Sequence, residues 1–480
     1  MTRIVPSRPS NDSSIAVRLA SSIAGARSDR GDAETDGDRG AKGIDAETAD
    51  RDGAARRRLA GVVWLVLVSQ VLVYPGVPDI VVALGAPAGV SAGMWFLVAE
   101  FAAFVAFAGP WGAASDALGR RGPLVVTGAV GGSLAYLTLA AAPRLGFGFS
   151  EALGVRVAGG ALTIGAFSLA ITMLMDLGGG HGRNMGAAGV AIGLGAALGS
   201  VVGGGLADLD PFYPIYASAG VLAAAGLLAS TVADRTVTRR IQASETRDGA
   251  SSPETSSPEV PNPEAPTPET STPIDEDPGF REVFARIRAV PALLVPFAFG
   301  FIDRLTAGFF ALVGVYYFQE GAFSLSAFGA GVTLALFFVP FALLQYPMGV
   351  LSDRIGRFLP VVVGSVAYGF VIIAVGLAPT YPIAAGAMVL VGVCGALVAP
   401  ATMALVTDLV GVDERGAAMG LFNVFGSLGF LTGFLVGGTV TEGFDYLTAF
   451  LVVGSMEIAI AIALFPAVRR IAARIETPAL

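Results

Sequence analysis

The amino-acid sequence predicts an all-α membrane protein with about twelve transmembrane helices arranged in two similar halves. Of its 480 residues, 54% are hydrophobic and only 14% are charged, whereas a soluble globular protein has about 25% charged residues. The apolar residues form runs of about 20, the length that an α-helix needs to cross a bilayer. A charged motif between two of these runs starts at Gly112 and recurs in the second half from Gly349. This repeat indicates a duplicated membrane protein.

The apolar runs divide the chain into five segments. The polar segment 1–57 lacks the apolar residues that would stabilise a fold, and we expect it to be a disordered tail. The Pro- and Glu-rich segment 234–288 is typical of an extended linker. These segments and a short tail, 471–480, flank a first bundle at 58–233 and a second bundle at 289–470. Each bundle is predicted to hold six helices, at 59–83, 91–111, 123–142, 152–175, 185–206 and 213–233, and at 291–318, 326–348, 359–378, 382–407, 416–440 and 444–466.

The placement of arginine predicts the orientation in the membrane. If all twelve helices span, nearly all arginines near helix ends fall on one side. The loops on the opposite side hold Arg144 and are otherwise mostly acidic or neutral. Because positively charged loops stay in the cytoplasm, both termini, the linker and both copies of the motif are predicted to be cytoplasmic. We expect a multi-pass protein of the plasma membrane.

The composition argues against several other classes of protein. The chain has one cysteine, Cys394, and one histidine, His181, so an intrachain disulfide is excluded and a protein-bound metal is not expected. No phosphate-binding loop or nucleophile motif appears, so we expect no cofactor and no enzymatic activity. We also expect no nucleic-acid partner and a monomeric protein.

The repeated motif reads Gly112-Ala-Ala-Ser-Asp116-Ala-Leu-Gly119-Arg120 in the first half and Gly349-Val-Leu-Ser-Asp353-Arg-Ile-Gly356-Arg357 in the second. Its glycines are expected to let a loop turn sharply between two helices, and its aspartates lie at helix ends beside an arginine. The next loop of each half on the same side carries a second Asp and Arg at equal spacing, namely Asp176 with Arg183 and Asp408 with Arg415. The arginines alone would serve topology, but the paired aspartates favour a role in contacts between helices.

This motif, together with six predicted helices, a polar linker and six more helices, resembles the major facilitator superfamily of secondary transporters over residues 58–470. Arg156-Val-Ala-Gly-Gly160 is similar to that family's fourth-helix pattern, and Pro75-Gly-Val-Pro78 resembles a pattern of its drug–proton antiporters. The resemblance implies two pseudo-symmetric bundles, with a substrate bound between them near mid-bilayer and alternating access. It also implies that the motif charges form a cytoplasmic latch between the bundles, closed when the protein faces outward.

Rows of glycines at every fourth position occur in one predicted helix of each half, at Gly195, Gly199 and Gly203, and at Gly429, Gly433 and Gly437. The first row is similar to a pattern of antiporters, although Ser200 stands where that family has proline. Such a row lets a neighbouring backbone approach closely, which suits helices that pack tightly and rock. Close packing without motion is the alternative.

Four ionisable residues lie within predicted helices, where a charge is costly and usually marks function: Glu100, Arg156, Asp303 and Arg304. Asp303 and Arg304 are neighbours that point about 100° apart on a helix, so each is expected to seek a partner elsewhere. Two pairings would join the halves, Glu100 with Arg304 or Arg156 with Asp303. Either these groups form permanent ion pairs, or Glu100 or Asp303 binds a proton whose affinity a moving arginine changes. The first helix offers only Gln70 as a further polar candidate.

These residues and the resemblance imply a transporter that exports a small lipophilic or drug-like molecule in exchange for protons or another ion. A sugar carrier needs several Asn, Gln and Trp residues facing its cavity, and these are scarce in the predicted helices. An importer or uniporter of a sugar or organic acid is one alternative, and a non-transporting membrane sensor on the same fold is another. The expected partners are a small-molecule substrate, protons and the lipid bilayer.

Overall fold

The computed structural model describes residues 36–178, 181–232, 288, 290–411 and 414–476. Its contacts separate two units, residues 1–53 and 54–480, and the second unit holds the helical bundles. In the described residues all regular structure is helical, and twelve helices are long and apolar enough to cross a membrane. The number of spans predicted from the sequence is confirmed. The predicted linker lies almost entirely outside the described residues.

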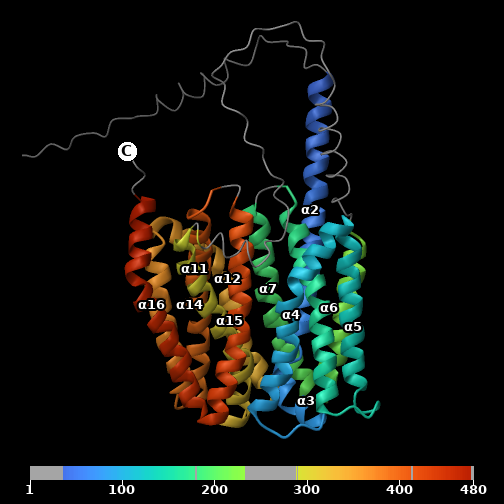
Figure 1. Ribbon diagram of the computed structural model, residues 1–480, viewed down its shortest axis with the longest axis vertical. Helices are drawn as coiled ribbons and strands as arrows, with labels where there is room; N and C mark the ends of the chain where they lie inside the picture. Colours follow the sequence, from blue (N-terminus) through green and yellow to red (C-terminus); the bar gives the residue numbers. More distant parts are fainter. Residues whose placement is uncertain (1–35, 179–180, 233–287, 289, 412–413, 477–480) are drawn as a thin grey trace, which may run out of the picture. The chain divides into compact units, whose positions relative to one another are not determined.

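Six spans form the first half (Figure 1). The first span consists of α2 (Asp36–Val71), a 3-10 turn η1 (Tyr74–Gly76) and α3 (Val77–Ala83). It is interrupted near Pro75 and Pro78 because proline lacks the N–H group that continues a helix. The other five spans are α4 (Val90–Leu118), α5 (Gly122–Ala141), α6 (Phe149–Met175), α7 (His181–Ala207) and α8 (Tyr213–Ser230).

The second half repeats this arrangement with six more spans. The seventh span combines η2 (Pro291–Leu293), α11 (Leu294–Phe309) and two π-helical segments, η3 (Phe310–Gly314) and η4 (Tyr317–Gly321). The others are α12 (Ala327–Ile355), η5 (Leu359–Val363) with α13 (Gly364–Gly376), α14 (Tyr381–Asp408), α15 (Arg415–Gly443) and α16 (Tyr446–Glu476).

The same pairs of helices pack together in both halves. α4 packs along α6 and α5 along α8, as α12 packs along α14 and α13 along α16. α7 lies against α2 as α15 lies against α11. The halves meet where α7 packs on α12 and α4 packs on α15, and Figure 1 shows them as a blue-to-green and a yellow-to-red bundle. The two pseudo-symmetric bundles expected from the sequence are therefore present.

The repeated motif lies mostly within helices. Our prediction that it forms a loop is wrong for the residues up to Leu118 and Ile355. α4 and α12 continue through Gly112 and Gly349 and end only after the aspartate of each copy. The chain turns at Gly119 and Gly356, whose φ angles are 65° and 83°, a backbone conformation that glycine adopts without steric cost. The helix persists through the earlier glycine because one glycine costs a helix only about 1 kcal/mol.

The first helix begins earlier than the sequence analysis expected. α2 starts at Asp36, inside the segment 1–57 that we assigned to a disordered tail. Its added turns contain several Ala and Arg residues, which favour helices, beside Asp and Gly residues, which do not. Extending a helix from a stable span needs no new nucleation, and this explains how a polar segment continues it. Residues 1–35 and 477–480 lie outside the described residues.

The glycine rows face the first helix of their own half. A Cβ atom added at Gly203 would lie 2.0 Å from the carbonyl oxygen of Leu72, directly after α2. One added at Gly433 would lie 2.2 Å from the carbonyl oxygen of Leu305 in α11. The remaining glycines of the rows face the same two helices: Gly195, Gly199, Gly429 and Gly437. Each half is thus built around a helix pair whose backbones are in contact.

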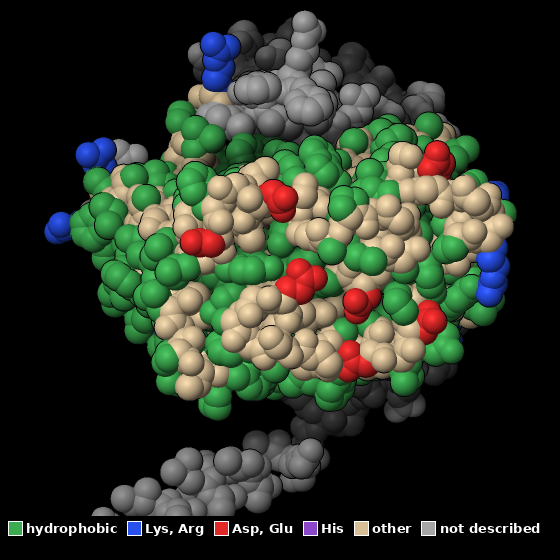
Figure 2. All heavy atoms as spheres, turned by 90° about the horizontal axis from the view of Figure 1, so that it is seen from below, with side chains coloured by type: hydrophobic (Ala, Val, Ile, Leu, Met, Phe, Trp, Pro, Cys, Tyr) green, Lys and Arg blue, Asp and Glu red, His purple; other side chains and the backbone are tan. Residues whose placement is uncertain are grey.

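The two ends of the bundles differ in charge. We call the helix ends that hold Asp116 and Asp353 the motif side and the opposite ends the far side. Figure 2 shows the far side, where acidic side chains are scattered over an apolar surface. The carboxylates at far-side helix ends belong to Asp79, Glu151, Asp208, Asp210, Glu320, Glu442 and Asp445. Arg144 is the one basic residue in the described far-side loops, so the charges segregate as the sequence indicated.

We expect Gly433→Ala to destabilise the protein by about 1–3 kcal/mol, because overpacking a close contact forces backbones apart. Thermal unfolding of the purified protein in detergent measures the change. Gly420→Ala in the same helix is the control, since a Cβ atom there would meet nothing within 4 Å. Equal shifts in unfolding temperature for both variants would contradict the importance of this contact.

Candidate functional site

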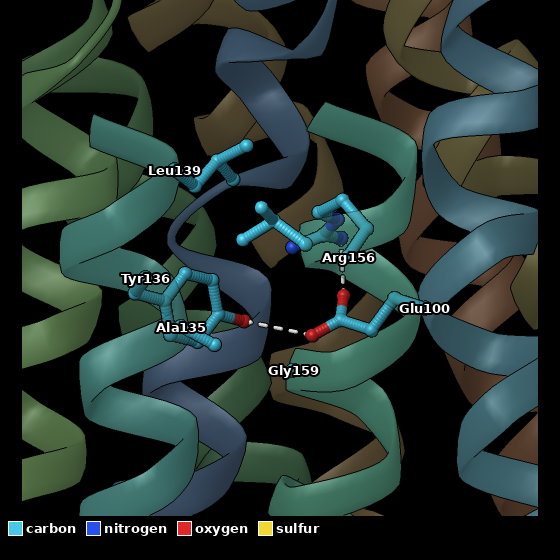
Figure 3. Close-up of a pocket in the computed structure, with 7 residues that line it drawn as sticks. Glu100, Ala135, Tyr136, Leu139, Arg156 and Gly159 are labelled. Atoms are coloured by element: carbon cyan, nitrogen blue, oxygen red, sulfur yellow. Dashed lines mark hydrogen bonds and ion pairs between the residues drawn. The ribbon is translucent and has the colours of Figure 1, made fainter. Parts of the chain in front are cut away.

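Glu100 and Arg156 form an ion pair inside the first half (Figure 3). Glu100 projects from α4 and Arg156 from α6, and both side chains are buried. Tyr136 of α5 donates its hydroxyl group to Glu100 Oε1 at 3.0 Å. Arg156 Nε donates to the carbonyl oxygen of Phe96 at 3.3 Å, and the guanidinium carbon lies 4.3 Å from the centre of the Phe96 ring. The two charges therefore compensate each other in a closed cluster.

Close packing of α4 and α6 holds this pair together. A Cβ atom added at Gly160, one turn after Arg156, would lie 2.1 Å from the carbonyl oxygen of Glu100. The cavity beside the pair is lined in part by Tyr136 and Gly159 (Figure 3). It is about the size of one water molecule. A substrate has no room there in this conformation.

Asp303 and Arg304 lie side by side on α11 in the second half. Asp303 is 6% exposed, whereas the side chain of Arg304 is 38% exposed. Arg304 Nε lies 4.0 Å from Asp303 Oδ2, which is a loose ion pair. A Cβ atom added at Gly426 would lie 3.2 Å from Arg304 Cγ, so the arginine lies against α15. Asp303 is thus a buried acid beside a partly exposed cation.

The sequence analysis missed a third buried acid, Glu457 of α16. Its side chain is fully buried, and its carboxylate accepts hydrogen bonds from Ser365 of α13 at 2.8 Å and from Thr306 of α11 at 3.4 Å. The signal was present, because Glu457 is the one acid well inside the predicted helix 444–466. The cost of burying a charge in a membrane, which selected Glu100, applies equally to it.

The pairs that we expected across the halves are wrong. Among these four residues, Glu100 pairs with Arg156 in its own half, and Asp303 lies beside its neighbour Arg304. The expectation considered only the direction in which adjacent residues point from a helix. The packing of α4 on α6 brings Glu100 and Arg156 together, and the long arginine side chain of Arg304 reaches back along its own helix.

On the motif side of the first half, Arg121 links the ends of two helices. It bonds to Asp176 at the end of α6 and lies 3.8 Å from Asp116 at the end of α4. Arg120, which the motif led us to expect in this place, is exposed. Asp176 was expected beside Arg183, whose side chain lies outside the described residues.

The second half has the corresponding cluster around the arginine of the motif itself. Arg357 bonds to Asp353 of α12, and its Nε donates to Asp408 of α14 at 3.1 Å. Arg415, which we expected beside Asp408, is exposed at the start of α15. Each of these ion pairs joins helices of one half, because α12 and α14, like α4 and α6, pack along each other up to these ends. A latch between the halves stays a proposal.

The two halves touch on the far side and near the centre. Gln319 of η4 donates Nε2 to the carbonyl oxygen of Pro75 in η1 at 2.7 Å. Nearer the centre, Phe101 of α4 stacks on Phe430 of α15 with ring centroids 4.7 Å apart. Gln70, in the same span as Pro75, is buried.

Toward the motif side, α4 and α15 carry exposed residues. Phe107 of α4 is 45% exposed and Val424 of α15 is 48% exposed. A Cβ atom added at Gly109 or at Gly420 would meet nothing within 4 Å. The facing helices are thus in contact in their far-side halves and uncovered in their motif-side halves.

Comparison with known proteins gives the chain a family. A family model described as Major Facilitator Superfamily matches residues 59–329 and 300–478. The protein named Multidrug efflux pump LfrA, from Mycolicibacterium smegmatis, is 31% identical over 112 residues. That stretch is 23% of this chain and covers only 22% of the length of that relative.

Several solved structures share the fold at low sequence identity. The nucleoside transporter NupG is 15% identical with a TM-score of 0.64, over 87% of this chain and 99% of that chain. The human organic anion transporter MFSD10 is 19% identical with a TM-score of 0.61, over 86% and 99%. A D-xylose-proton symporter is 15% identical with a TM-score of 0.62, over 85% and 96%.

We expect Arg156→Met to destabilise the protein by about 3–5 kcal/mol, because it leaves Glu100 charged and unpaired in an apolar interior. Adding Glu100→Gln should recover much of the loss, since Gln keeps an acceptor for the Tyr136 hydroxyl group. Thermal unfolding of the single and double variants measures this coupling. Purely additive effects would contradict a direct ion pair.

Proposed function

The chain belongs to the Major Facilitator Superfamily, and from that premise we propose that it exports a small lipophilic or drug-like molecule in exchange for protons. Its family and fold are those of membrane transporters of small molecules. The observation that carries the proposal is the unequal contact between the halves, which meet on the far side and near the centre, while α4 and α15 carry exposed residues toward the motif side. A carrier with alternating access closes one end while the other is open.

The segregation of charge supports an orientation for this state. Arginines gather on the motif side, among them Arg121, Arg357 and Arg415, while the far side is acidic. The positive-inside rule then places the motif side, the termini and the linker in the cytoplasm. In that orientation the described conformation faces inward, ready to receive a cytoplasmic substrate.

The surface between α4 and α15 supports an apolar substrate. Phe101 stacks on Phe104 at 5.3 Å and on Phe430 at 4.7 Å. Phe107 and Val424 add exposed apolar side chains to the motif-side halves of the same two helices. Aromatic and aliphatic side chains bind lipophilic molecules by excluding water. The similarity to a protein named as a multidrug efflux pump points the same way.

The buried acids of the second half support coupling to protons. Asp303 is buried, and its nearest cation, Arg304, is loosely placed and partly exposed. Burial disfavours a charged carboxylate and a nearby cation favours it, so a movement of Arg304 changes the proton affinity of Asp303. Glu100, in contrast, is held in a closed ion pair with Arg156. We therefore place the proton coupling in the second half, where Asp303 takes part in it, and give the Glu100–Arg156 pair a structural role.

Purified protein in liposomes tests the exchange. We expect an imposed pH gradient to drive accumulation of a fluorescent lipophilic dye. Asp303→Asn should reduce that accumulation and change its dependence on pH but keep exchange of dye at equal pH, because exchange needs no net proton movement. Glu442→Gln, at an exposed far-side position, should behave like the unaltered protein. Dye movement that does not depend on the pH gradient would contradict the proposal. So would a pH gradient that drives a sugar or nucleoside but not the dye.

Cysteine labelling tests the orientation and the open side. In a Cys394→Ser background, Phe107→Cys should react with a membrane-impermeant maleimide in inside-out vesicles, because the motif side is uncovered there. Leu209→Cys, 73% exposed on the far side, should react in intact cells instead. The reverse pattern would overturn the orientation, and protection of Phe107→Cys from both sides would contradict the exposure of α4 toward the motif side.

A further inference from the structure

Away from its helix ends, the described part of the second half has more acids than cations. Away from helix ends, its described spans hold two carboxyl groups, Asp303 and Glu457, and one guanidinium group, Arg304. The first half holds one of each, Glu100 and Arg156, as an ion pair. If both acids of the second half were ionised, one negative charge would stay uncompensated inside the bilayer, which is costly. One proton on either acid removes that charge.

We propose that Glu457 holds the proton that this transporter exchanges, and that Asp303 competes for it. The inference rests on the proposed proton coupling and names a group for it in α16. Glu457 has no cation partner among the described residues, since the hydroxyl groups of Ser365 and Thr306 occupy its two oxygens. Asp303 has Arg304 at 4.0 Å. The cation favours the charged form of Asp303, so the neutral form belongs to Glu457.

Thr306 brings the two acids into one site. It lies three residues after Asp303 on α11, and residues three apart share a helix face. Its hydroxyl oxygen is 3.4 Å from Glu457 Oε2, and the two carboxyl groups interact electrostatically. Two neighbouring buried carboxylates disfavour each other's charge, so they share one proton. Glu457 takes this proton from water and releases it to water, so each gain or loss changes the charge of the second half by one.

A buried hydroxyl group gives independent support for a site at this place. Tyr368 of α13 is fully buried, and its hydroxyl group has no hydrogen-bond partner among the described residues. It lies close enough to both acids to interact with them electrostatically. Cys394 of α14 is a further titratable group that interacts with Glu457. The titratable groups of α15, Arg415 and Glu442, lie at the ends of that helix.

The location links the proton to Arg304, which lies beside Asp303 and against α15. α16 packs on α11, α13 and α15 of its own half, so Glu457 lies within the bundle. Loss of its proton adds a second negative charge beside Arg304, which attracts the partly exposed guanidinium group into the bundle. When Glu457 gains the proton, Asp303 remains as the charged acid beside Arg304. The proton thus changes the charge that the second half presents along α11 and α15.

Infrared spectroscopy of the purified protein tests the proton without any transport. A protonated carboxyl group in an apolar site gives its own carbonyl band, which we expect at neutral pH in the unaltered protein and not in Glu457→Gln. Glu442→Gln should keep the band. Asp303→Asn should keep it but change the pH at which it disappears, because the competing charge is gone. A band that persists unchanged in Glu457→Gln would overturn the inference.

Ser365→Ala provides a second variant that keeps the acid. Removing the hydrogen bond at Glu457 Oε1 should move the carbonyl band to higher frequency, because a carbonyl group with fewer hydrogen bonds vibrates faster. An unmoved band would show that another acid carries the proton. This variant decides the matter even if Glu457→Gln does not fold, which thermal unfolding reveals.

Transport in liposomes separates this inference from the proposed function. Glu457→Gln should lose pH-driven dye accumulation by about tenfold or more, because no group couples the gradient, and should keep dye exchange at equal pH. If a pH gradient does not drive dye accumulation by the unaltered protein, the proposed function fails, while the infrared band still tests whether Glu457 is protonated. If both proteins respond equally to the gradient, only this inference fails. A sodium gradient that drives the unaltered protein and not Glu457→Gln would replace the proton by a cation and overturn it.

Discussion

A charge inside a bilayer has to be compensated within the protein, and the two halves of this chain do so in different ways. In the first half Glu100 meets Arg156 in a closed cluster that leaves no net charge. In the described spans of the second half, away from helix ends, Arg304 is the one cation that can compensate the two acids Asp303 and Glu457. A balanced pair keeps its charge at every stage of a transport cycle. An unbalanced set stays in the membrane only by gaining a proton, and this is why the proton is assigned to the second half.

Close contacts make each half a stiff unit, so the movement of transport falls between the halves. Gly203 and Gly433 let helix backbones touch within a half, and Arg121 and Arg357 tie helix ends together on the motif side. Packed cores and ion-pair clusters change between discrete arrangements and do not deform continuously. Between the halves, α4 and α15 carry exposed residues toward the motif side, where a rotation of one bundle against the other would bring them into contact.

Patterns along the chain predicted the spans well and the contacts poorly. Twelve apolar runs of spanning length, a repeated motif and two glycine rows are visible without any knowledge of packing. The helical course of α4 through Gly112 was missed because a glycine and an aspartate also suit a loop. Arg121, and not the expected Arg120, pairs with Asp176 at the end of α6. The direction in which the chain leaves the turn decides which of the two adjacent arginines points at α6. Glu457 was overlooked although the reasoning that selected Glu100 also applied to it.

By itself, the sequence determined that this protein is a duplicated twelve-helix membrane transporter of its family, with arginine concentrated on one side. These properties follow from the local rule that backbone groups in lipid must be satisfied within a helix. Only the tertiary structure decided the partners of the buried charges. Glu100 and Arg156 meet, and Glu457 meets Ser365 and Thr306, through contacts between helices far apart in the chain. Such contacts depend on which helix faces pack together, and the spacing of residues along one helix does not contain that information.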